Sequence, residues 1–190
     1  MFGIKWLESK EEKWGDFKTE AMPHVAGLYR LAMWLTRNKD EAEDLVQETL
    51  MQALKSFHRY EVGTNCRAWM AAIMYNLNLK RIQKLHKIKL VDDSEERLAE
   101  TIPFEPQIPE TITDEEVINA ISKVPENFRQ VLVLSDVEEY SYKDISSILG
   151  VPIGTVMSRL SRARKVLRME LADYARNHGF GDTENKIAAG

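Results

Sequence analysis

Cysteine is nearly absent from this sequence, which has a single one, Cys66, among 190 residues. One thiol excludes an internal disulfide, cannot by itself form a cysteine-based zinc site, and favours a reducing compartment. Long apolar runs are also missing, since no segment approaches the roughly 20 apolar residues that span a bilayer and the first residues lack a signal-peptide core. We therefore expect a cytoplasmic protein that is not inserted into a membrane.

The usual features of enzymes are lacking as well. The four histidines are dispersed, and none pairs with Cys66 or another histidine at metal-ligand spacing along a helix. There is no glycine-rich phosphate loop of the Walker type. The sequence therefore predicts no enzyme activity, no metal and no other cofactor. Cys66 at a helix start is either a redox-sensitive thiol with a lowered pKa or a small semi-buried residue, and we favour the second.

Glycine and proline are sparse, with 9 and 6 copies, and no segment alternates apolar and polar residues as a strand would. The sequence therefore predicts an all-α fold. Three prolines (Pro103, Pro106 and Pro109) fall in an acidic segment without helical periodicity. We expect two small helical domains, residues 1–87 and 113–176, joined by a flexible linker, residues 88–112, and followed by a tail, residues 177–190.

The net charge of −4 argues against a nucleic-acid binder only if the charge is evenly spread, and it is not. Residues 55–89 contain eight Lys or Arg and one acid, and residues 145–169 contain five bases and no acid. Between them, residues 92–139 contain fourteen acids and three bases. Two basic blocks indicate two contacts with a polyanion, one from each half, although each block alone is equally explained by a solvated helix face.

Helical spacing organises the first half. We expect helices over Pro23–Thr36, from Asn38 to about Phe57, and over Cys66–His86, with a loop at Tyr60–Asn65. The helix that begins near Asn38 has one apolar face, and its opposite face carries Asp44, Gln47, Glu48 and Met51.

The second half predicts a helix-turn-helix. Capping boxes at Thr113–Glu116 and Ser141–Asp144 begin two helices, and another begins at Pro125. The helix from Ser141 ends at Gly150, and a last helix covers about Ile153–Tyr174.

The last helix separates two kinds of residue. At 100° per residue, Val156, Leu160, Ala163 and Leu167 share a face that would pack on the core. Thr155, Ser158, Arg159 and Arg162 share another face, which we call the recognition stripe. Lys165 lies at its edge and Arg164 well away from it. Hydroxyls and guanidiniums near a helix N-terminus suit the major groove, although an ordinary amphipathic helix with a basic face has the same pattern.

Specific motifs carry more information than periodicity. The segment Tyr140–Arg164 contains the core Pro152-x-Gly-Thr-Val-x-Ser-Arg-x-x-Arg-Ala-Arg, preceded by Val124-Pro-Glu-x-x-Arg129. The first half contains two further motifs, Asp40-Glu-Ala-Glu-Asp-Leu-Val-Gln-Glu-Thr49 and Ala68-Trp69 with Asn76. Over residues 16–171 the chain resembles the extracytoplasmic-function (ECF) sigma factors of the sigma-70 superfamily, with region two in the first half and region four in the second.

The resemblance implies a subunit that binds core RNA polymerase and directs promoter-specific initiation, held inactive by an anti-sigma factor. It implies that region four reads the duplex minus-thirty-five element through Pro152, Thr155, Ser158, Arg159, Arg162 and Lys165. It implies that region two docks on polymerase through Asp44, Gln47, Glu48 and Met51. We call these four residues the docking face.

The resemblance also implies that region two opens the minus-ten element around the loop at Tyr60–Asn65. Aromatic and basic side chains suit single-stranded DNA, because bases stack on rings and the backbone is attracted by positive charge. The candidates are Phe57, Arg59, Tyr60, Asn65, Arg67, Trp69, Asn76 and Lys80. Phe57 and Trp69 are also candidates for the core, and we favour that interpretation for both.

Several alternatives remain open at this level. A free-standing helix-turn-helix regulator leaves the first-half motifs unexplained, and a sigma mimic that only binds an anti-sigma factor does not need the basic residues. The acidic linker is either a spacer or a mimic of nucleic acid in a basic channel. Met157 stands where the family often has a basic residue, so one DNA contact is expected to be missing. The promoter sequence is not predicted.

Overall fold

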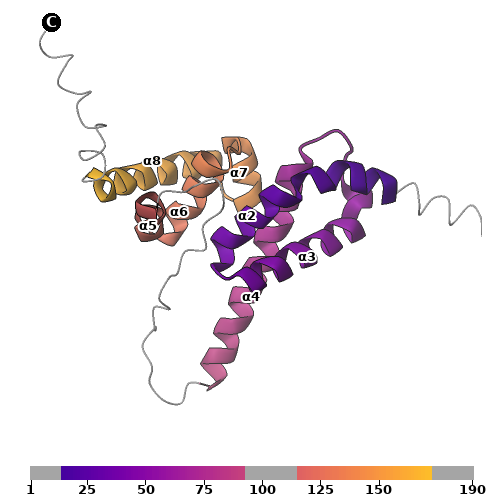
Figure 1. Ribbon diagram of the computed structural model, residues 1–190, viewed down its shortest axis with the longest axis horizontal. Helices are drawn as coiled ribbons and strands as arrows, with labels where there is room; N and C mark the ends of the chain where they lie inside the picture. The colour runs from indigo at the N-terminus through magenta and orange to yellow at the C-terminus, as the bar shows by residue number, and fades with distance from the viewer. Residues whose placement is uncertain (1–13, 93–114, 173–190) are drawn as a thin grey trace, which may run out of the picture. The chain divides into compact units, whose positions relative to one another are not determined.

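The computed structural model describes residues 14–92 and 115–172, with the backbone alone over residues 85–92 (Figure 1). Within these ranges the chain forms helices, turns and loops and no β-strand, which confirms the predicted all-α fold. The chain divides into two compact units, one of N-terminal and one of C-terminal helices. Most of the predicted linker and the whole predicted tail lie outside the described residues. No helix in the described ranges combines the length and apolar content that crossing a bilayer requires.

The first unit begins with a helix over residues 14–21. The elements that follow are the 3₁₀ turn η1 (Met22–His24), α2 (Val25–Thr36), α3 (Lys39–Ser56), the 3₁₀ turn η2 (Phe57–Arg59) and α4 (Cys66–Asp92). Pro23 lies in η1, so the predicted helix Pro23–Thr36 starts as a 3₁₀ turn and becomes α-helical at Val25. Proline is tolerated there because the first N–H groups of a helix have no partner within it.

The corner between α2 and α3 is closed by capping. Arg37 adopts a left-handed conformation, φ 56°, and its N–H donates to the carbonyl of Met33. Asn38 then caps α3, because its side-chain oxygen accepts a hydrogen bond of 3.0 Å from the N–H of Glu41. Asp40 and Glu41 in the first turn complement the positive helix end. The predicted start of this helix is confirmed.

Helices α2, α3 and α4 pack around one core. Leu28, Leu31, Leu45, Met70 and Met74 are fully or almost fully buried in it. The apolar stripe predicted for α3 is buried at Ala42, Leu45, Val46, Thr49 and Ala53. Leu54, predicted on the same stripe, is instead 40% exposed, because it is near the end of α3, where its side chain leaves the core.

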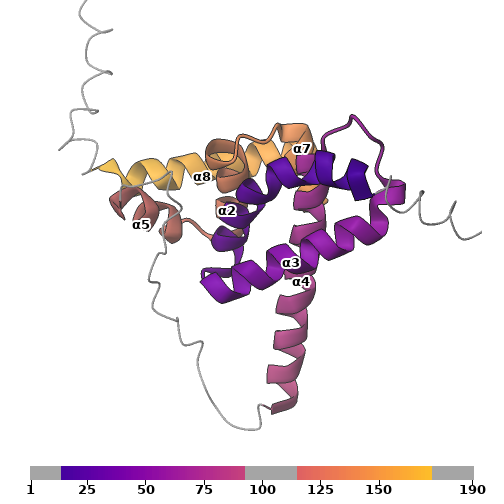
Figure 2. The same ribbon diagram turned by 45° about the vertical axis from the view of Figure 1, so that its right-hand side comes forward.

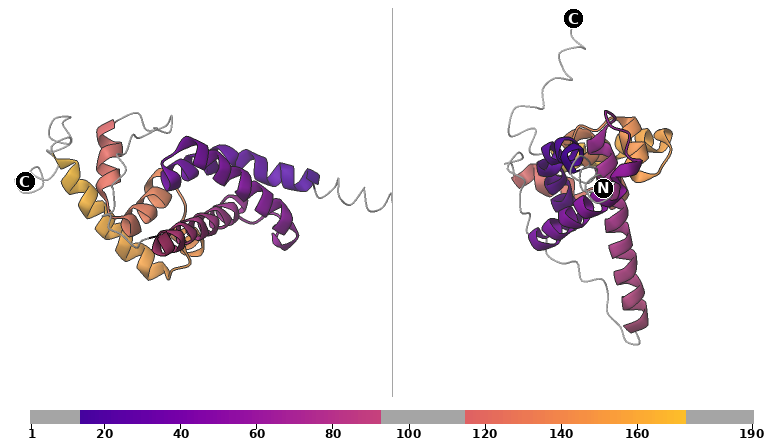
Figure 3. Two further views of the ribbon diagram at one scale, coloured as in Figure 1. Left: turned by 90° about the horizontal axis from the view of Figure 1, so that it is seen from below. Right: turned by 90° about the vertical axis from the view of Figure 1, so that its right-hand side faces the viewer.

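Helix α4 is longer than the sequence analysis expected. It was predicted to end near His86, but it runs to Asp92, past residue 87, where we ended the first domain. Figures 1 and 3 show its C-terminal part extending beyond α2 and α3. No glycine or proline occurs between Cys66 and Pro103, so the sequence holds no strong stop signal before the acidic segment.

The second unit contains α5 (Glu115–Lys123), α6 (Glu126–Leu132), the π-helical turn η3 (Val133–Val137), α7 (Tyr142–Leu149) and α8 (Ile153–Glu170). Figure 2 shows α5 and α7 beside α8, the longest of these helices. Ile118, Leu132, Ile145, Val156 and Leu160 form its buried centre. The helix predicted from Pro125 is thus divided into α6 and a π turn. Because a π turn differs from an α-helix only in its wider hydrogen-bonded ring, sequence periodicity cannot distinguish it from a continuous helix.

The motif Val124-Pro-Glu-x-x-Arg129 has a structural explanation. Pro125 precedes α6 as its N-cap residue. Arg129 is buried, its Nη1 donates to the carbonyl of Ser122 at 2.9 Å, and it also pairs with Glu126. Arg129 therefore satisfies a carbonyl at the end of α5 and joins the first two helices of the unit.

The helix-turn-helix forms where it was predicted. Ser141 caps α7, since its hydroxyl oxygen accepts from the N–H of Asp144 at 3.1 Å. Helix α7 ends at Gly150, whose φ of 64° is a conformation that favours glycine. The hydroxyl of Ser146 donates to the carbonyl of Val151 at 2.6 Å, which fixes the turn before α8. Helix α8 is assigned over Ile153–Glu170. Thr113, the other predicted cap, and Tyr174, the predicted end of the last helix, both lie outside the described residues.

Candidate nucleic-acid interface

The recognition stripe lies on the side of α8 away from the core. Val156, Leu160 and Ala163 are buried. Ser158, Arg162 and Lys165 are exposed, Thr155 and Arg159 are half-buried, and Pro152 is exposed at the N-cap position. Ser158 donates its hydroxyl to the carbonyl of Thr155 at 3.1 Å, so its oxygen remains available as an acceptor. The stripe therefore offers cations and hydroxyls to a ligand along two turns of one helix.

Arg164 is held away from this stripe by a carboxylate. Its Nε and Nη2 donate to the two oxygens of Asp136 in η3, at 3.0 and 2.7 Å. The hydrogen bond from Arg164 holds the pKa of Asp136 below its ordinary value, and the same bond raises the pKa of Arg164. The sequence analysis excluded Arg164 from the stripe but did not find its partner.

The aromatic candidates of the first unit belong to a larger group. The group, which we call the aromatic cluster, is made of Trp14, Phe17, Phe57, Tyr60 and Trp69. The ring centres of Tyr60 and Trp69 are 4.9 Å apart, and those of Phe17 and Phe57 are 5.4 Å apart and nearly perpendicular. Phe57 and Tyr60 are buried and Trp69 is half-buried. Phe57 thus lies in the core, as favoured, whereas Trp69 keeps part of its surface open.

Tyr60 uses its hydroxyl inside the unit. Its Oη lies 2.8 Å from the carbonyl of Thr64 and 3.0 Å from Oε2 of Glu20, two acceptors that compete for one proton. Burial raises the pKa of Tyr60, so the phenol stays protonated. The phenol therefore ties the loop after η2 to the helix over residues 14–21. Spacing gave no signal for Glu20, which is 40 residues away in the chain.

The other five candidates of the first unit are partly or fully exposed. Arg59, Asn65, Asn76 and Lys80 are exposed, and Arg67 is half-buried. Asn65 also acts as a helix cap, because its side-chain oxygen accepts from the N–H of Ala68 at 3.0 Å. An asparagine directly before a helix commonly caps it, so the sequence could have predicted this cap, although Asn65 was expected only to bind DNA.

The structure decides between the two interpretations of Cys66. The residue is 3% exposed. Burial, assisted by the nearby Glu20 carboxylate, raises the pKa of Cys66 to about 11. A helix start lowers a thiol pKa only if burial does not outweigh it, and here burial does. The semi-buried interpretation holds, and the redox interpretation with a lowered pKa was wrong in direction.

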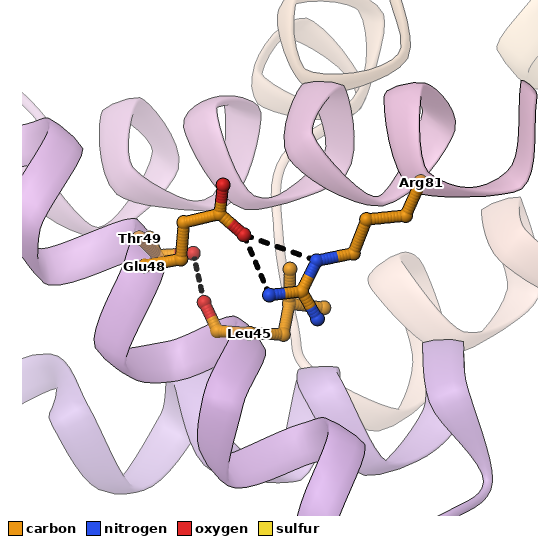
Figure 4. Close-up of polar contacts among 4 residues, drawn as sticks. All are labelled: Leu45, Glu48, Thr49 and Arg81. Atoms are coloured by element: carbon orange, nitrogen blue, oxygen red, sulfur yellow. Dashed lines mark hydrogen bonds and ion pairs between the residues drawn. The ribbon is translucent and has the colours of Figure 1, made fainter. Parts of the chain in front are cut away.

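The docking face is exposed along α3. Asp44, Gln47, Glu48 and Met51 all point away from the core, and Met51 is 58% exposed. Glu48 is not free, because its Oε2 accepts from Nε and Nη2 of Arg81 in α4 at 3.0 and 2.5 Å. Figure 4 shows this pair bridging the two helices, beside the bond of 2.7 Å that the neighbouring Thr49 donates to the carbonyl of Leu45.

No group of three His, Cys, Asp or Glu side chains gathers as metal ligands in the part of the chain that the structure describes.

Both units match known families. Residues 21–88 match the family described as Sigma-70 region 2, and residues 114–167 match Sigma-70, region 4. The chain is 33% identical over 176 residues to the ECF RNA polymerase sigma factor EcfG of Rhodopseudomonas palustris (strain TIE-1), over 92% of this chain and 96% of that protein. The chain belongs to the ECF RNA polymerase sigma factor family.

Other members of the family agree. The chain is 33% identical over 189 residues to the ECF RNA polymerase sigma factor SigE of Mycolicibacterium smegmatis (strain ATCC 700084 / mc(2)155), over 90% of this chain and 72% of that protein. Its structure resembles the sigma factor RpoE, solved in complex with the anti-sigma factor NepR from Bartonella quintana, with a TM-score of 0.68 and 32% identity over 83% of this chain and 97% of RpoE.

Family membership decides several expectations. Sigma factors are transcription initiation factors and not enzymes, and they bind core RNA polymerase and promoter DNA. The alternative of a free-standing regulator is therefore wrong for this chain. Which residues of this sigma factor make each contact is a separate question.

Proposed function

We propose that the second unit of this sigma factor reads a duplex minus-thirty-five element through α8 and that the first unit holds the melted minus-ten element. The observation that carries the proposal is the recognition stripe, because its polar and cationic side chains face outward while the opposite side of α8 is buried. A helix that must pack only one face leaves the other for the major groove.

In the second unit, Arg162 is the leading base-reading residue. It is exposed, and a guanidinium can donate two parallel hydrogen bonds to guanine. Arg159 is half-buried, so we assign it a contact nearer the groove edge. Pro152, Thr155, Ser158 and Lys165 complete the surface as backbone or phosphate contacts near the helix N-terminus.

In the first unit, burial divides the candidates into two groups. Exposed Arg59, Asn76 and Lys80 are proposed to hold the DNA backbone, and Asn65 and Arg67 flank the loop that receives an unstacked base. Half-buried Trp69 can offer a ring face for stacking. Phe57 and Tyr60 are proposed to support the loop from beneath, because their rings are buried and the Tyr60 hydroxyl already has partners.

The docking face is proposed to bind core polymerase. Asp44, Gln47 and Met51 are exposed and combine polar groups with an apolar side chain, as interfaces commonly do. Glu48 would contribute its second carboxylate oxygen, since both hydrogen bonds from Arg81 are accepted by Oε2.

Domain limits, location and regulation are part of the same proposal. We place region two within residues 1–87 and region four within residues 113–176, with 88–112 as the linker. Because a sigma factor acts on RNA polymerase, the cytoplasm is its proposed location. An anti-sigma factor is proposed as the inhibitor, supported by the complex of RpoE with NepR, to which this chain is similar over most of its length.

Run-off transcription on genomic fragments, with purified core polymerase, tests the proposal. We expect discrete transcripts that require this chain and that are lost with Arg159→Ala/Arg162→Ala, while the variant still binds core polymerase. Arg168→Ala, an exposed cation on the same helix outside the stripe, is the matched control and should retain the transcripts.

Two outcomes would count against the assignment. Transcripts that persist in the double variant would remove the recognition stripe from promoter reading. No transcripts at all, with a folded chain that binds an anti-sigma factor tightly, would favour a sigma mimic. Met51→Asp should separately reduce binding of core polymerase, and unchanged binding would remove the docking face.

A further inference from the structure

Arg164 of α8 is joined to η3 through its guanidinium. Two of its nitrogens donate to the two oxygens of Asp136 in the π turn η3, at 3.0 and 2.7 Å. These two bonds to Asp136 are also the main cause of the raised pKa of Arg164. Because Arg164 itself belongs to α8, the contact links the recognition helix to η3.

The geometry separates Arg164 from the DNA-facing residues. It follows Arg162 by two positions, so at 100° per residue the two side chains diverge by about 160° around α8. The fork uses Nε and Nη2, two of the donors with which an arginine would otherwise contact guanine or phosphate. An Arg164 that reached for DNA would have to leave Asp136.

Surface ion pairs usually contribute little, but this pair meets the condition under which they matter. The two hydrogen bonds are parallel and bidentate, so the contact fixes an orientation as well as a distance. Asp136 also lies inside a π turn, a rare conformation that rotates the following residues relative to an α-helix. The pair therefore constrains how α8 lies against η3.

We propose that Arg164 is a positioning residue: with Asp136 it sets the orientation of α8, so that the recognition stripe meets the major groove. This inference rests on the proposed function of the stripe. Arg164 itself does not touch DNA. Its contribution to promoter recognition passes through the angle of the helix on which Arg162 stands.

The sign of the effect of Asp136→Asn distinguishes this role from simple electrostatics. Removing a carboxylate near DNA should tighten binding if only charge matters, because one repulsion of the phosphates is lost. Loss of the fork should weaken binding instead, by about tenfold, because α8 is no longer held in the orientation that presents the recognition stripe. The two explanations therefore predict opposite changes.

The experiment uses the full chain in holoenzyme, on a promoter fragment identified by run-off transcription. Affinity is measured against salt concentration for the wild type, Asp136→Asn, Arg164→Gln, Arg164→Lys and Arg162→Gln. Each phosphate contact adds about 0.9 to the slope of log affinity against log salt. We expect Arg164→Gln and Asp136→Asn to weaken binding with the slope unchanged, and the double variant Asp136→Asn/Arg164→Gln to be no weaker than either single one.

Arg164→Lys keeps the charge without the fork and should also weaken binding, so it serves if the glutamine variant does not fold. Thermal unfolding followed by circular dichroism sets a temperature at which every variant is native. A second fragment with an altered minus-thirty-five element measures discrimination, which should fall in all the fork variants. Simple destabilisation would not move that ratio in the folded fraction.

The outcomes separate this inference from the proposed function. If Arg162→Gln changes neither affinity nor discrimination, the function of the stripe fails. If Arg162→Gln weakens binding but Asp136→Asn leaves it unchanged or tighter, the positioning role of Arg164 fails alone. A slope that drops by about 0.9 in Arg164→Gln would make Arg164 a phosphate contact and would equally overturn the inference.

Discussion

The two units present their candidate residues in opposite ways. In the second unit, Ser158, Arg162 and Lys165 stand exposed on one side of a single helix. In the first unit, Phe57 and Tyr60 are buried in the aromatic cluster, and the exposed candidates are the polar residues Arg59, Asn65, Asn76 and Lys80. A helix packed on one face exposes residues in a pattern that its own sequence predicts, whereas a cluster assembled from several elements does not.

Because of this difference, substitutions that lower folding stability can be separated from substitutions that lower DNA affinity. Substitution of a buried ring should change folding of the first unit, and substitution of an exposed cation should change only binding. The units can be observed separately, because the four tryptophans (Trp6, Trp14, Trp34 and Trp69) all belong to the N-terminal half. Tryptophan fluorescence therefore reports on the first unit, and far-ultraviolet circular dichroism reports on both.

The largest expected effect is from Phe57→Ala. The ring is buried and contacts Phe17, Tyr60 and Trp69, so its removal leaves a cavity at the centre of the aromatic cluster. We expect the free energy of unfolding of the first unit to fall by about 3–5 kcal/mol. Urea unfolding followed by tryptophan fluorescence measures this.

Arg59→Ala is the matched control for Phe57→Ala, because Arg59 belongs to the same 3₁₀ turn but is exposed. Its stability should change by less than about 0.5 kcal/mol. Equal destabilisation by the two variants would mean that the cluster does not hold the unit together, and the contrast between the units would lose its basis.

A second effect appears at high pH and only in the first unit. The folded pKa of Cys66 is raised to about 11 from an ordinary 9.0, so stability from the neutral thiol is complete below pH 9 and is lost as pH rises through the folded value. The raised pKa of Tyr60 acts in the same direction. Unfolding free energies under reducing conditions, measured by tryptophan fluorescence from pH 8 to about pH 11, should therefore decline.

Cys66→Ser separates the contribution of thiol ionisation from that of lysine titration, because serine does not ionise in that range. The variant should decline less steeply between pH 9 and 11 than the wild type. Parallel curves for the two proteins would show that the thiol is as easily ionised in the folded as in the unfolded state.

The smallest expected effects come from removing one helix cap in each unit. Asn38→Ala removes the bond to the N–H of Glu41, and Ser141→Ala removes the bond to the N–H of Asp144. Each should lower the stability of its own unit by about 1 kcal/mol. Asn38→Ala should shift the fluorescence transition, and Ser141→Ala should shift only the circular dichroism transition. A fluorescence shift in Ser141→Ala would show that the units do not unfold independently.

Much of the fold was predictable because it depends on near neighbours. The caps at Asn38 and Ser141 and the left-handed turn at Gly150 each depend on hydrogen bonds between residues at most four positions apart. The local sequence therefore predicts them. The buried stripe of α8 follows from helical periodicity. The end of α4 was predicted too early because a charged, apolar sequence without glycine or proline continues a helix as readily as it begins a linker.

The candidate sites were predicted less completely, and the failures share a cause. The family resemblance selected Tyr60 as a contact residue but gave no sign of Glu20. Helical periodicity excluded Arg164 from the recognition stripe without finding Asp136. Glu48 was expected to lie on the docking face, and nothing in the sequence indicated that Arg81 of α4 pairs with it. In each case the deciding residue comes from a distant part of the chain.

The sequence by itself determined the all-helical fold, the helix limits in most places, the helix-turn-helix and, through its motifs, the sigma factor family. Only the tertiary structure decided which aromatic rings are buried, that the Cys66 thiol is hard to ionise, and which carboxylates hold Tyr60, Arg81 and Arg164. Helix caps and faces depend on hydrogen bonds and spacing within one or two turns. The three pairs join residues 40, 33 and 28 positions apart, and only packing of the helices brings them within hydrogen-bond distance.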